Sequence, residues 1–304
     1  AESVFRDMSR RDIISWTTML TLYVDNGHGK KALQLFREMQ VGCGSALLDD
    51  RVFVVSLQAC GILAEEEEAL IVDGRSTKLM SLDITKALHA DACQKGYGSN
   101  VYVCTTLVNT YGKCGEVSLA EEVFNGLSER NIVSWNAIIA GYARQGQSES
   151  VFDLFVEIIE KGIRPNHITF LGALSACSHA GLVDVILYYF MAMESSHGFA
   201  PLISHFNCML DAFARAGQFN EAVLMIQKMP HQPNLASWCS ILGACCKWGN
   251  VELGRHAFEC ASKLTKSNAS LFIVMANIYT DAHMWEQLHI IETALQSSMV
   301  LEHG

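Results

Sequence analysis

The sequence predicts an all-α protein, a right-handed α-solenoid of helix-turn-helix repeats of about 31–36 residues. The first observation behind this prediction is that three stretches are near copies of one another, namely Asp12–Thr17, Asn131–Asn136 and Asn234–Cys239. The second is that the tryptophan in each stretch is followed eleven residues later by a glycine. The third is that 304 residues contain only 4 prolines and no Ser/Gly-rich linker, which suits one continuous array.

The eleven-residue step predicts the first helix of each repeat. It recurs without tryptophan from Cys104 to Gly115, from Phe170 to Gly181 and from Phe206 to Gly217. Eleven residues make about three helical turns, and a glycine beyond them can adopt the left-handed conformation that ends a helix. Each step is therefore interpreted as one short helix with its stop.

A second apolar pattern follows each glycine and predicts the second helix. Small or aliphatic residues come five positions later, large ones nine positions later and apolar ones twelve positions later, which places all three on one helical face. These residues are Ala32, Phe36 and Met39; Ala120, Phe124 and Leu127; Val151, Phe155 and Ile158; Ile186, Phe190 and Met193; Ala222, Ile226 and Met229; Gly254, Phe258 and Ala261. We interpret them as the core between neighbouring helices.

These patterns divide the chain into units. Residues 1–12 are expected to end a truncated repeat, so the chain is expected to be a fragment, and the following units are 13–49, 50–100, 101–131, 132–166, 167–202, 203–234, 235–268 and 269–304. Unit 50–100 is too long for one hairpin and is expected to carry an insertion at about 61–88. Its acidic run Glu65–Glu68 favours a solvated loop or a helix extension, and an acidic partner site is the alternative.

Composition restricts the function classes. The net charge of −10 argues against a strongly basic nucleic-acid binder. The 11 cysteines include no CxxC pair and are interpreted as small buried hydrophobes in a reducing compartment. No run of 18 apolar residues occurs, so no membrane partner is expected.

Several motifs resemble the plant pentatricopeptide repeat family, and specifically its PLS subclass. Leu107–Gly115 is similar to a short S unit, Asn131–Ile139 to a P unit, and Thr169–Cys177 to an L unit. Trp238–Gly254 and Asn277–Tyr279 resemble the two E motifs that follow the last S unit in organellar RNA editing factors of the E and DYW types. On this resemblance 13–49 and 132–166 are P units, 50–100 and 167–202 are L units, 101–131 and 203–234 are S units, and 235–268 and 269–304 are E motifs.

The resemblance implies that each unit reads about one base of single-stranded RNA. The reading pair is the residue after the unit's aromatic position and the residue that closes the unit. Thr17 with Asp49 would select guanine, Thr105 with Asn131 adenine, and the pairs Asn136 with Asn166 and Asn207 with Asn234 a pyrimidine. Val54 with Asn100 would read weakly, Leu171 with Leu202 little or nothing, and Cys239 with Asn268 is unassigned. The alternative role of these polar residues is helix capping.

Two further sets complete the expected interface. Ile14, Val133 and Ile168 would clamp base faces, and Tyr102 could stack on one. A positively charged residue recurs two positions before the repeat glycine, at Lys113, Arg144, Arg215 and Lys247. His179 occupies the same position in another unit, and Asp25 is the exception. These cations would contact RNA phosphates, with stabilisation of helix C-termini as the alternative. So few cations predict a shallow salt dependence of binding.

No enzyme is predicted within the chain. A zinc deaminase needs HxE and PCxxC, and none of the 11 histidines is followed two residues later by Glu. We expect no cofactor. The resemblance implies a mitochondrial or chloroplast protein that selects a cytidine for conversion to uridine, with a deaminase domain in cis or trans and multiple organellar RNA editing factors as partners. RNA binding for splicing, stability or translation and a tetratricopeptide-like protein scaffold are the alternatives.

Overall fold

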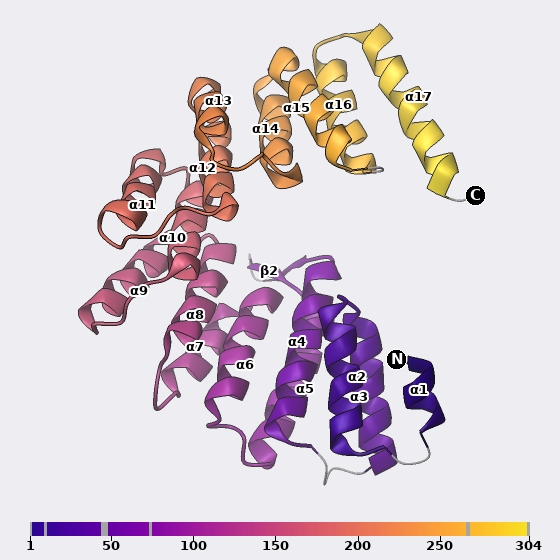
Figure 1. The fold of residues 1–304 in the computed structure, drawn as a ribbon, viewed down its shortest axis with the longest axis vertical. Helices are drawn as coiled ribbons and strands as arrows, with labels where there is room; N and C mark the ends of the chain where they lie inside the picture. The colour runs from indigo at the N-terminus through magenta and orange to yellow at the C-terminus, as the bar shows by residue number, and fades with distance from the viewer. Residues whose placement is uncertain (1, 9–10, 44–47, 73–74, 266–267, 303–304) are drawn as a thin grey trace. The chain divides into compact units, whose positions relative to one another are not determined.

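The computed structural model describes residues 2–8, 11–43, 48–72, 75–265 and 268–302, and it consists mainly of helical hairpins (Figure 1). A short helix, α1 (Glu2–Asp7), precedes the first hairpin. The first helices of the hairpins are α2 (Ile13–Asp25), α4 (Asp50–Glu66), α6 (Val101–Cys114), α8 (Ile132–Arg144), α10 (His167–Ala180), α12 (Ile203–Arg215), α14 (Leu235–Trp248) and α16 (Ala269–Asp281). The second helices are α3 (Gly29–Cys43), α5 (Leu79–Gln94), α7 (Val117–Asn125), α9 (Ser148–Glu160), α11 (Val183–Ser195), α13 (Phe219–Lys228), α15 (Val251–Leu264) and α17 (Trp285–Glu302).

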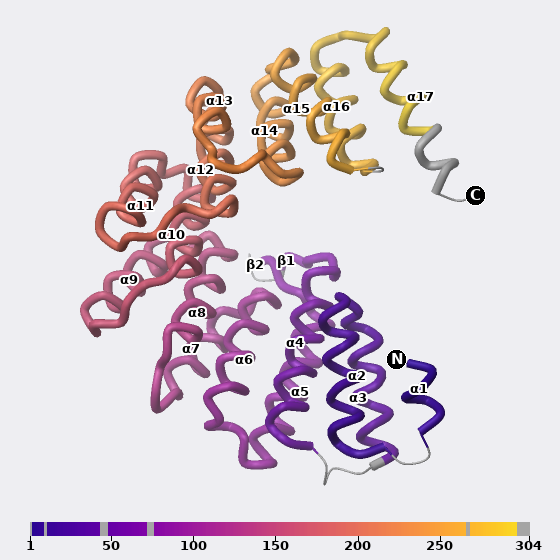
Figure 2. The backbone as a smooth tube through the Cα atoms, in the orientation of Figure 1, coloured from indigo at the N-terminus to yellow at the C-terminus, as the bar shows by residue number. Residues whose placement is uncertain are grey.

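The hairpins stack within two compact parts, an N-terminal part (1–172) and a C-terminal part (173–304), and the backbone of each can be followed in Figure 2. In the N-terminal part α2 packs on α4, α4 on α6 and α6 on α8. In the C-terminal part α12 packs on α14 and α14 on α16. First helices thus form one layer within each part, and second helices cover it. The expected all-α solenoid is confirmed.

Glycines in the left-handed conformation separate the two helices of a hairpin, as the eleven-residue step predicts. Their φ angles lie between +68° and +88° at Gly27, Gly115, Gly146, Gly181, Gly217 and Gly249. In the last hairpin the equivalent position is eleven residues after Phe272 and holds His283, whose φ is +55°. Among the described residues it is the one non-glycine with a positive φ. A side chain in this conformation strains the backbone.

Aromatic contacts join α1 to the first hairpin and several hairpins to the next one. In each of these contacts a phenylalanine meets the aromatic residue of the following first helix edge to face, an arrangement that aromatic pairs favour. The ring centroids are 4.9–5.2 Å apart in the pairs Phe5–Trp16, Phe124–Trp135, Phe155–Phe170, Phe190–Phe206 and Phe258–Phe272. The predicted core positions are buried, except that Phe190, Ile226 and Phe258 are only half-buried.

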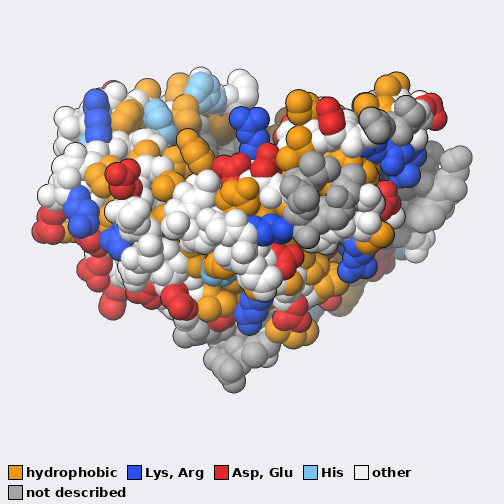
Figure 3. All heavy atoms as spheres, turned by 90° about the horizontal axis from the view of Figure 1, so that it is seen from below, with side chains coloured by type: hydrophobic (Ala, Val, Ile, Leu, Met, Phe, Trp, Pro, Cys, Tyr) orange, Lys and Arg blue, Asp and Glu red, His pale blue; other side chains and the backbone are white. Residues whose placement is uncertain are grey.

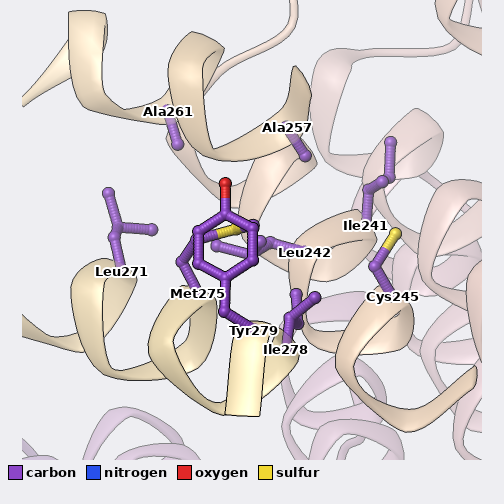
Figure 4. Close-up of a cluster of buried hydrophobic side chains, with 9 residues drawn as sticks. All are labelled: Ile241, Leu242, Cys245, Ala257, Ala261, Leu271, Met275, Ile278 and Tyr279. Carbon is purple, nitrogen blue, oxygen red and sulfur yellow. The ribbon is translucent and has the colours of Figure 1, made fainter. Parts of the chain in front are cut away.

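The core of the C-terminal part shows how three helices share one cluster (Figure 4). The cluster includes Ile241 and Cys245 of α14, Ala261 of α15, and Met275 and Tyr279 of α16. The cysteine is a small buried hydrophobe here, and burial raises the pKa of its thiol to about 12. All ten cysteines whose side chains are described are free thiols.

The segment at about 61–88, where an insertion is expected, contains the end of α4, two short strands and the start of α5. Residues up to Glu66 continue α4, as a helix extension, and residues from Leu79 belong to α5. Between them, β1 (Leu70–Val72) and β2 (Arg75–Thr77) form an antiparallel hairpin, which the sequence analysis did not predict. Three-residue strands are too short to show an alternating pattern. Residues 73 and 74 lie outside the described ranges.

The hairpin is anchored by polar contacts at helix ends. The Glu67 carboxylate accepts hydrogen bonds from the backbone N–H groups of Met80 and Ser81, both at 2.9 Å, and so caps α5. Lys78 N–H donates to the carbonyl of Cys114 at 2.9 Å. Among the described residues, no helix combines the length and apolar composition needed to cross a membrane.

Candidate functional site

The candidate site lies at the N-terminal ends of the first helices, because the closing residue of each unit is the N-cap of the next first helix. Side-chain oxygens accept hydrogen bonds from the first-turn N–H groups at Asp12, Asp49, Asn100, Asn131, Asn166, Asn234 and Asn268. Leu202 has no such oxygen, and there the Nδ1 of buried His205 accepts from Leu202 N–H at 2.9 Å. The closing residues therefore do cap helices, and any base contact must use their remaining polar atoms.

The structure brings Asn136 and Asn166 into direct contact. Asn136 Nδ2 donates to Asn166 Oδ1 at 3.1 Å. The hydroxyl of Thr169 donates to Asn136 Oδ1 at 2.7 Å and lies 3.1 Å from Asn166 Oδ1. The same hydroxyl accepts from Asn166 N–H at 3.1 Å. Three residues of two adjacent helix ends thus form one closed network.

The same network recurs in the C-terminal part. Asn207 Nδ2 donates to Asn234 Oδ1 at 3.3 Å. The Ser237 hydroxyl donates to Asn207 Oδ1 at 2.6 Å and lies 3.0 Å from Asn234 Oδ1. Asn207 is half-buried, whereas only 6% of Asn136 is exposed.

Thr17 and Asp49 line one surface cleft of about 490 Å³ together with Ile14, Arg51 and Asp25. The Thr17 hydroxyl donates to the carbonyl of Ile13 at 2.7 Å. Asp49 accepts from Val52 N–H at 2.9 Å and keeps lone pairs for a further donor. The pair therefore offers oxygen acceptors in a cleft that is also lined by the exposed apolar side chains of Ile14 and Leu22.

Thr105 differs from Thr17, because its hydroxyl oxygen is buried and has no hydrogen-bond partner among the described residues. Asn131 accepts from the N–H groups of Val133 and Ser134, both at 3.0 Å. A buried hydroxyl without a partner is rare and costs free energy.

The remaining pairs carry less polar chemistry. Val54 is half-buried, and Asn100 donates instead to Asp50 Oδ2 at 3.1 Å. Leu171 is half-buried and Leu202 is exposed. Cys239 is half-buried, and Asn268 accepts from Ser270 N–H at 3.1 Å.

Apolar side chains at the second position of several units are exposed. The exposed fractions are 70% for Ile14, 73% for Tyr102, 59% for Val133 and 58% for Ile168. Val133 lies three residues before Asn136 on the same helical face, and Ile168 lies two residues after Asn166. Exposed apolar side chains thus flank the Asn136–Asn166 pair.

The expected phosphate contacts all lie in the last turn of a first helix. Two of them are ion-paired: Lys113 Nζ lies 2.7 Å from the Glu65 carboxylate, and Arg215 Nε lies 2.7 Å from that of Asp211. Lys247 and Arg144 are exposed, and the Lys247 ammonium lies 5.2 Å from the ring centre of Trp248. These positions also suit stabilisation of helix C-termini. On the face shown in Figure 3, Lys and Arg side chains are scattered among acidic and polar ones.

Sequence reasoning missed three polar residues of this site, namely Asp50, Thr169 and Ser237. A signal for two of them exists, because a Ser or Thr stands directly before the aromatic residue in several units, at Ser15, Ser134, Thr169 and Ser237. Asp50 gave no such signal, since its partner Asn100 is fifty residues away. Among the described residues, no group of three or more His, Cys, Asp or Glu side chains is placed to hold a metal ion.

The fold and this row of capped helix ends define a helical-repeat protein of the α-solenoid class. Comparison with family profiles finds the PPR repeat family at residues 130–179 and the PPR repeat at 14–42, 102–132, 204–232 and 236–260. The chain belongs to the PPR repeat family.

Full-length relatives agree with this assignment. The chain is 33% identical over 296 residues to the pentatricopeptide repeat-containing protein CRR2, chloroplastic, of Arabidopsis thaliana. It is 31% identical over 303 residues to the mitochondrial pentatricopeptide repeat-containing protein At1g77170 of the same plant. These matches cover 97% and 99% of the chain but only 43% and 61% of the relatives. The names of the relatives agree with the expected chloroplast or mitochondrial location.

Solved structures share the fold. The crystal structure of the pentatricopeptide repeat protein PPR10 from maize superposes with a TM-score of 0.57 at 20% identity, covering 95% of this chain and 39% of that one. PPR10 in complex with an 18-nt psaJ RNA element superposes with a TM-score of 0.58 at 15% identity, covering 97% of this chain and 47% of that one. At such identity the likeness concerns the architecture alone.

Proposed function

We propose that this chain binds single-stranded organellar RNA and reads it with side chains at the N-terminal ends of its first helices. The observation that carries the proposal is the repeated pair of amides, Asn136 with Asn166 and Asn207 with Asn234, held in the same geometry in both parts of the chain. Each Asn keeps donor or acceptor capacity beyond the network, and amides match the edges of nucleic-acid bases. The RNA complex of PPR10, a protein of the same fold, supports this choice.

A base would reach each pair between neighbouring helix ends. At Asn136 it would lie between Val133 and Ile168, whose exposed side chains would cover its two faces. Apolar contact with the faces of a base does not depend on which base is bound, so the amides would supply the selectivity. At Asn207 the corresponding residues are Ser204 and Ala236, and we propose a weaker grip there.

The proposed footprint from 5′ to 3′ is guanine, any base, adenine, pyrimidine, any base and pyrimidine. The carboxylate of Asp49 can accept hydrogen bonds from guanine, and the unpaired hydroxyl of Thr105 serves adenine. Leu171 and Leu202 offer no polar side-chain atom, which leaves the fifth position free. By the PLS and E assignment, three free positions follow, and then the cytidine that is converted to uridine by a deaminase outside this chain.

RNA binding is tested with ten-nucleotide RNAs that carry the footprint. We expect affinity to fall about tenfold when the adenine is replaced, the scale of one good base contact. The combined Asn136→Ala and Asn207→Ala variant should lose the preference for a pyrimidine at the fourth and sixth nucleotides. Equal affinity for the footprint and a scrambled RNA would contradict the proposal.

The editing role needs a separate experiment. Organellar RNA from plants that lack this protein is sequenced beside the wild type. We expect one cytidine, four nucleotides 3′ of a match to the footprint, to stay unconverted. If every edited site is unchanged while RNA binding is confirmed, the chain serves another step such as splicing, stability or translation.

A further inference from the structure

We propose that Thr169 and Ser237 are positioning residues that fix the amides of the preceding repeat, so that base selection in one repeat depends on a hydroxyl supplied by the next. This inference rests on the proposed function. Neither residue belongs to a reading pair. Thr169 lies in the unit after Asn136, and Ser237 in the unit after Asn207.

The orientation of Asn166 is set by its own backbone contacts. Its Oδ1 accepts from the N–H groups of Ile168 at 3.0 Å and Thr169 at 3.1 Å, so this atom must be the oxygen. Asn136 must then present Nδ2 to it, as the 3.1 Å contact requires. Consequently Asn136 Oδ1 faces the Thr169 hydroxyl, which donates its single hydrogen there.

The hydroxyl contact is the shorter of the two that hold each reading asparagine. At Asn136 the hydroxyl lies at 2.7 Å and the amide contact at 3.1 Å. At Asn207 the two distances are 2.6 Å and 3.3 Å. O–H···O hydrogen bonds are ordinarily shorter than N–H···O hydrogen bonds, and both kinds of contact lie within or close to their usual ranges. Without the hydroxyl, each reading asparagine keeps only its contact with the closing asparagine.

The network also determines what a base would meet. Asn136 uses one N–H and one lone pair of Oδ1 in the network, and one of each remains. The contacts of Asn166 use its Oδ1 and leave the hydrogens of its Nδ2 for a base acceptor. A donor and an acceptor at fixed positions can distinguish bases, whereas a rotating amide presents either group at the same place.

Ser134 provides a natural comparison within this chain. It occupies the same position as Thr169 and Ser237, but the preceding unit offers Thr105 in place of an asparagine. Its hydroxyl donates to the carbonyl of Asn131 at 2.8 Å, within its own helix end. Ser15 does the same with Asp12 at 2.8 Å. In the units that follow Asn136 and Asn207, the hydroxyls of Thr169 and Ser237 instead donate to the asparagine of the preceding repeat.

The test compares Thr169→Val, Thr169→Ser and Asn136→Ala in the full chain, with the ten-nucleotide RNA carrying each of the four bases at its fourth position. Valine keeps the volume of threonine and removes the hydroxyl, and serine restores it. We expect Thr169→Val to reduce the preference for pyrimidine over purine at this position about fivefold, the range of one hydrogen bond. The preference for adenine at the third position should not change, and Thr169→Ser should retain both.

Because Thr169 is fully buried, the Thr169→Val variant could fail to fold, and a second pair of variants then tests the same inference. Ser237→Ala should weaken selection at the sixth nucleotide, and Ser134→Ala, matched to it in chemistry, should leave selection unchanged. If hydroxyl removal preserves selection, or weakens binding to all RNAs equally, while Asn136→Ala abolishes selection, the inference is wrong and the proposed function stands. If Asn136→Ala also has no effect, the proposed function itself fails.

Discussion

The ammonium group of Lys113 lies 2.7 Å from the carboxylate of Glu65, so a cation proposed for the RNA backbone is held by an acid from the insertion. Glu65 is exposed at the end of α4, and Lys113 occupies the last turn of α6. The negative charge of Glu65 also acts on the guanidinium of Arg144. Glu65 therefore reduces the positive charge available at two neighbouring helix ends.

Removing this acid should strengthen RNA binding. We expect Glu65→Gln to raise affinity at low salt, because a freed Lys113 can neutralise a phosphate. The logarithm of affinity should then fall more steeply with the logarithm of salt, by about 0.7 per added phosphate contact. Fluorescence anisotropy over a salt series measures both quantities. Glu66→Gln makes the same change in net charge at the next residue, and equal effects of the two variants would exclude the ion pair as the cause.

Gly115 should be far less replaceable than Gly146, although both end a first helix with positive φ. A Cβ on Gly115 would lie 2.0 Å from the backbone oxygen of Ser76, whereas one on Gly146 meets nothing within 4 Å. We expect Gly146→Ala to cost about 1 kcal/mol of folding free energy through strain alone. Gly115→Ala should cost about 3 kcal/mol, because the hairpin must also move. Urea unfolding of the two variants measures the difference. Equal costs would mean that the β1–β2 hairpin moves away from residue 115 without a loss of stability.

Replacing His283 by glycine should stabilise the last hairpin. His283 takes the place of the turn glycine at a φ of +55°, which is strained for a residue with a Cβ. We expect His283→Gly to stabilise the last hairpin by about 1 kcal/mol. Repeat arrays open locally, so hydrogen exchange in α16 is the appropriate measurement. His283→Ala removes the ring contact with Trp285 but keeps the strain, and it should not stabilise.

The periodic part of this structure was predictable because one pattern determines it. The step from Trp135 to Gly146 set the start of α8, and an Asn before that start is also a good cap. The hairpin at 70–77 was not predictable, since its strands are too short for a pattern. The partners of hydroxyls depend on the neighbouring repeat. Ser134 follows a unit that offers Thr105 and donates to the carbonyl of Asn131 at its own helix end, whereas Ser237 donates to Asn207 of the preceding unit. Such contacts follow only from three-dimensional proximity.

Glu67 should make the stability of the chain depend on acid. Burial raises the pKa of its carboxyl group, whereas hydrogen bonds from Ser81 and Met80 and the charge of Lys78 lower it. The lowering effects together are larger, so the net shift of the pKa is downward. A carboxyl group with a lowered folded-state pKa stabilises the fold above its unfolded pKa, about 4.5, and loses this contribution as pH falls through the folded pKa. Unfolding midpoints at pH 7 and at decreasing pH should therefore converge between wild type and Glu67→Gln. A gap that stays constant with pH would show that the carboxylate charge is not involved.

Substitution of Thr105 should change stability and RNA binding in opposite directions, because its buried hydroxyl has no hydrogen-bond partner among the described residues. We expect Thr105→Val to stabilise the free protein by about 1 kcal/mol, since the cost of an unsatisfied polar group disappears. The same change should weaken binding to RNA with adenine at the third position about tenfold, because the hydroxyl is proposed to contact that base. Thermal unfolding and fluorescence anisotropy measure the two effects. Thr106→Val is the matched control on the same helix. The Thr106 hydroxyl donates to the backbone carbonyl of Tyr102 at 2.8 Å, so loss of this hydroxyl should not stabilise the protein. A Thr105→Val variant that gains stability without losing adenine selection would remove Thr105 from the reading pair.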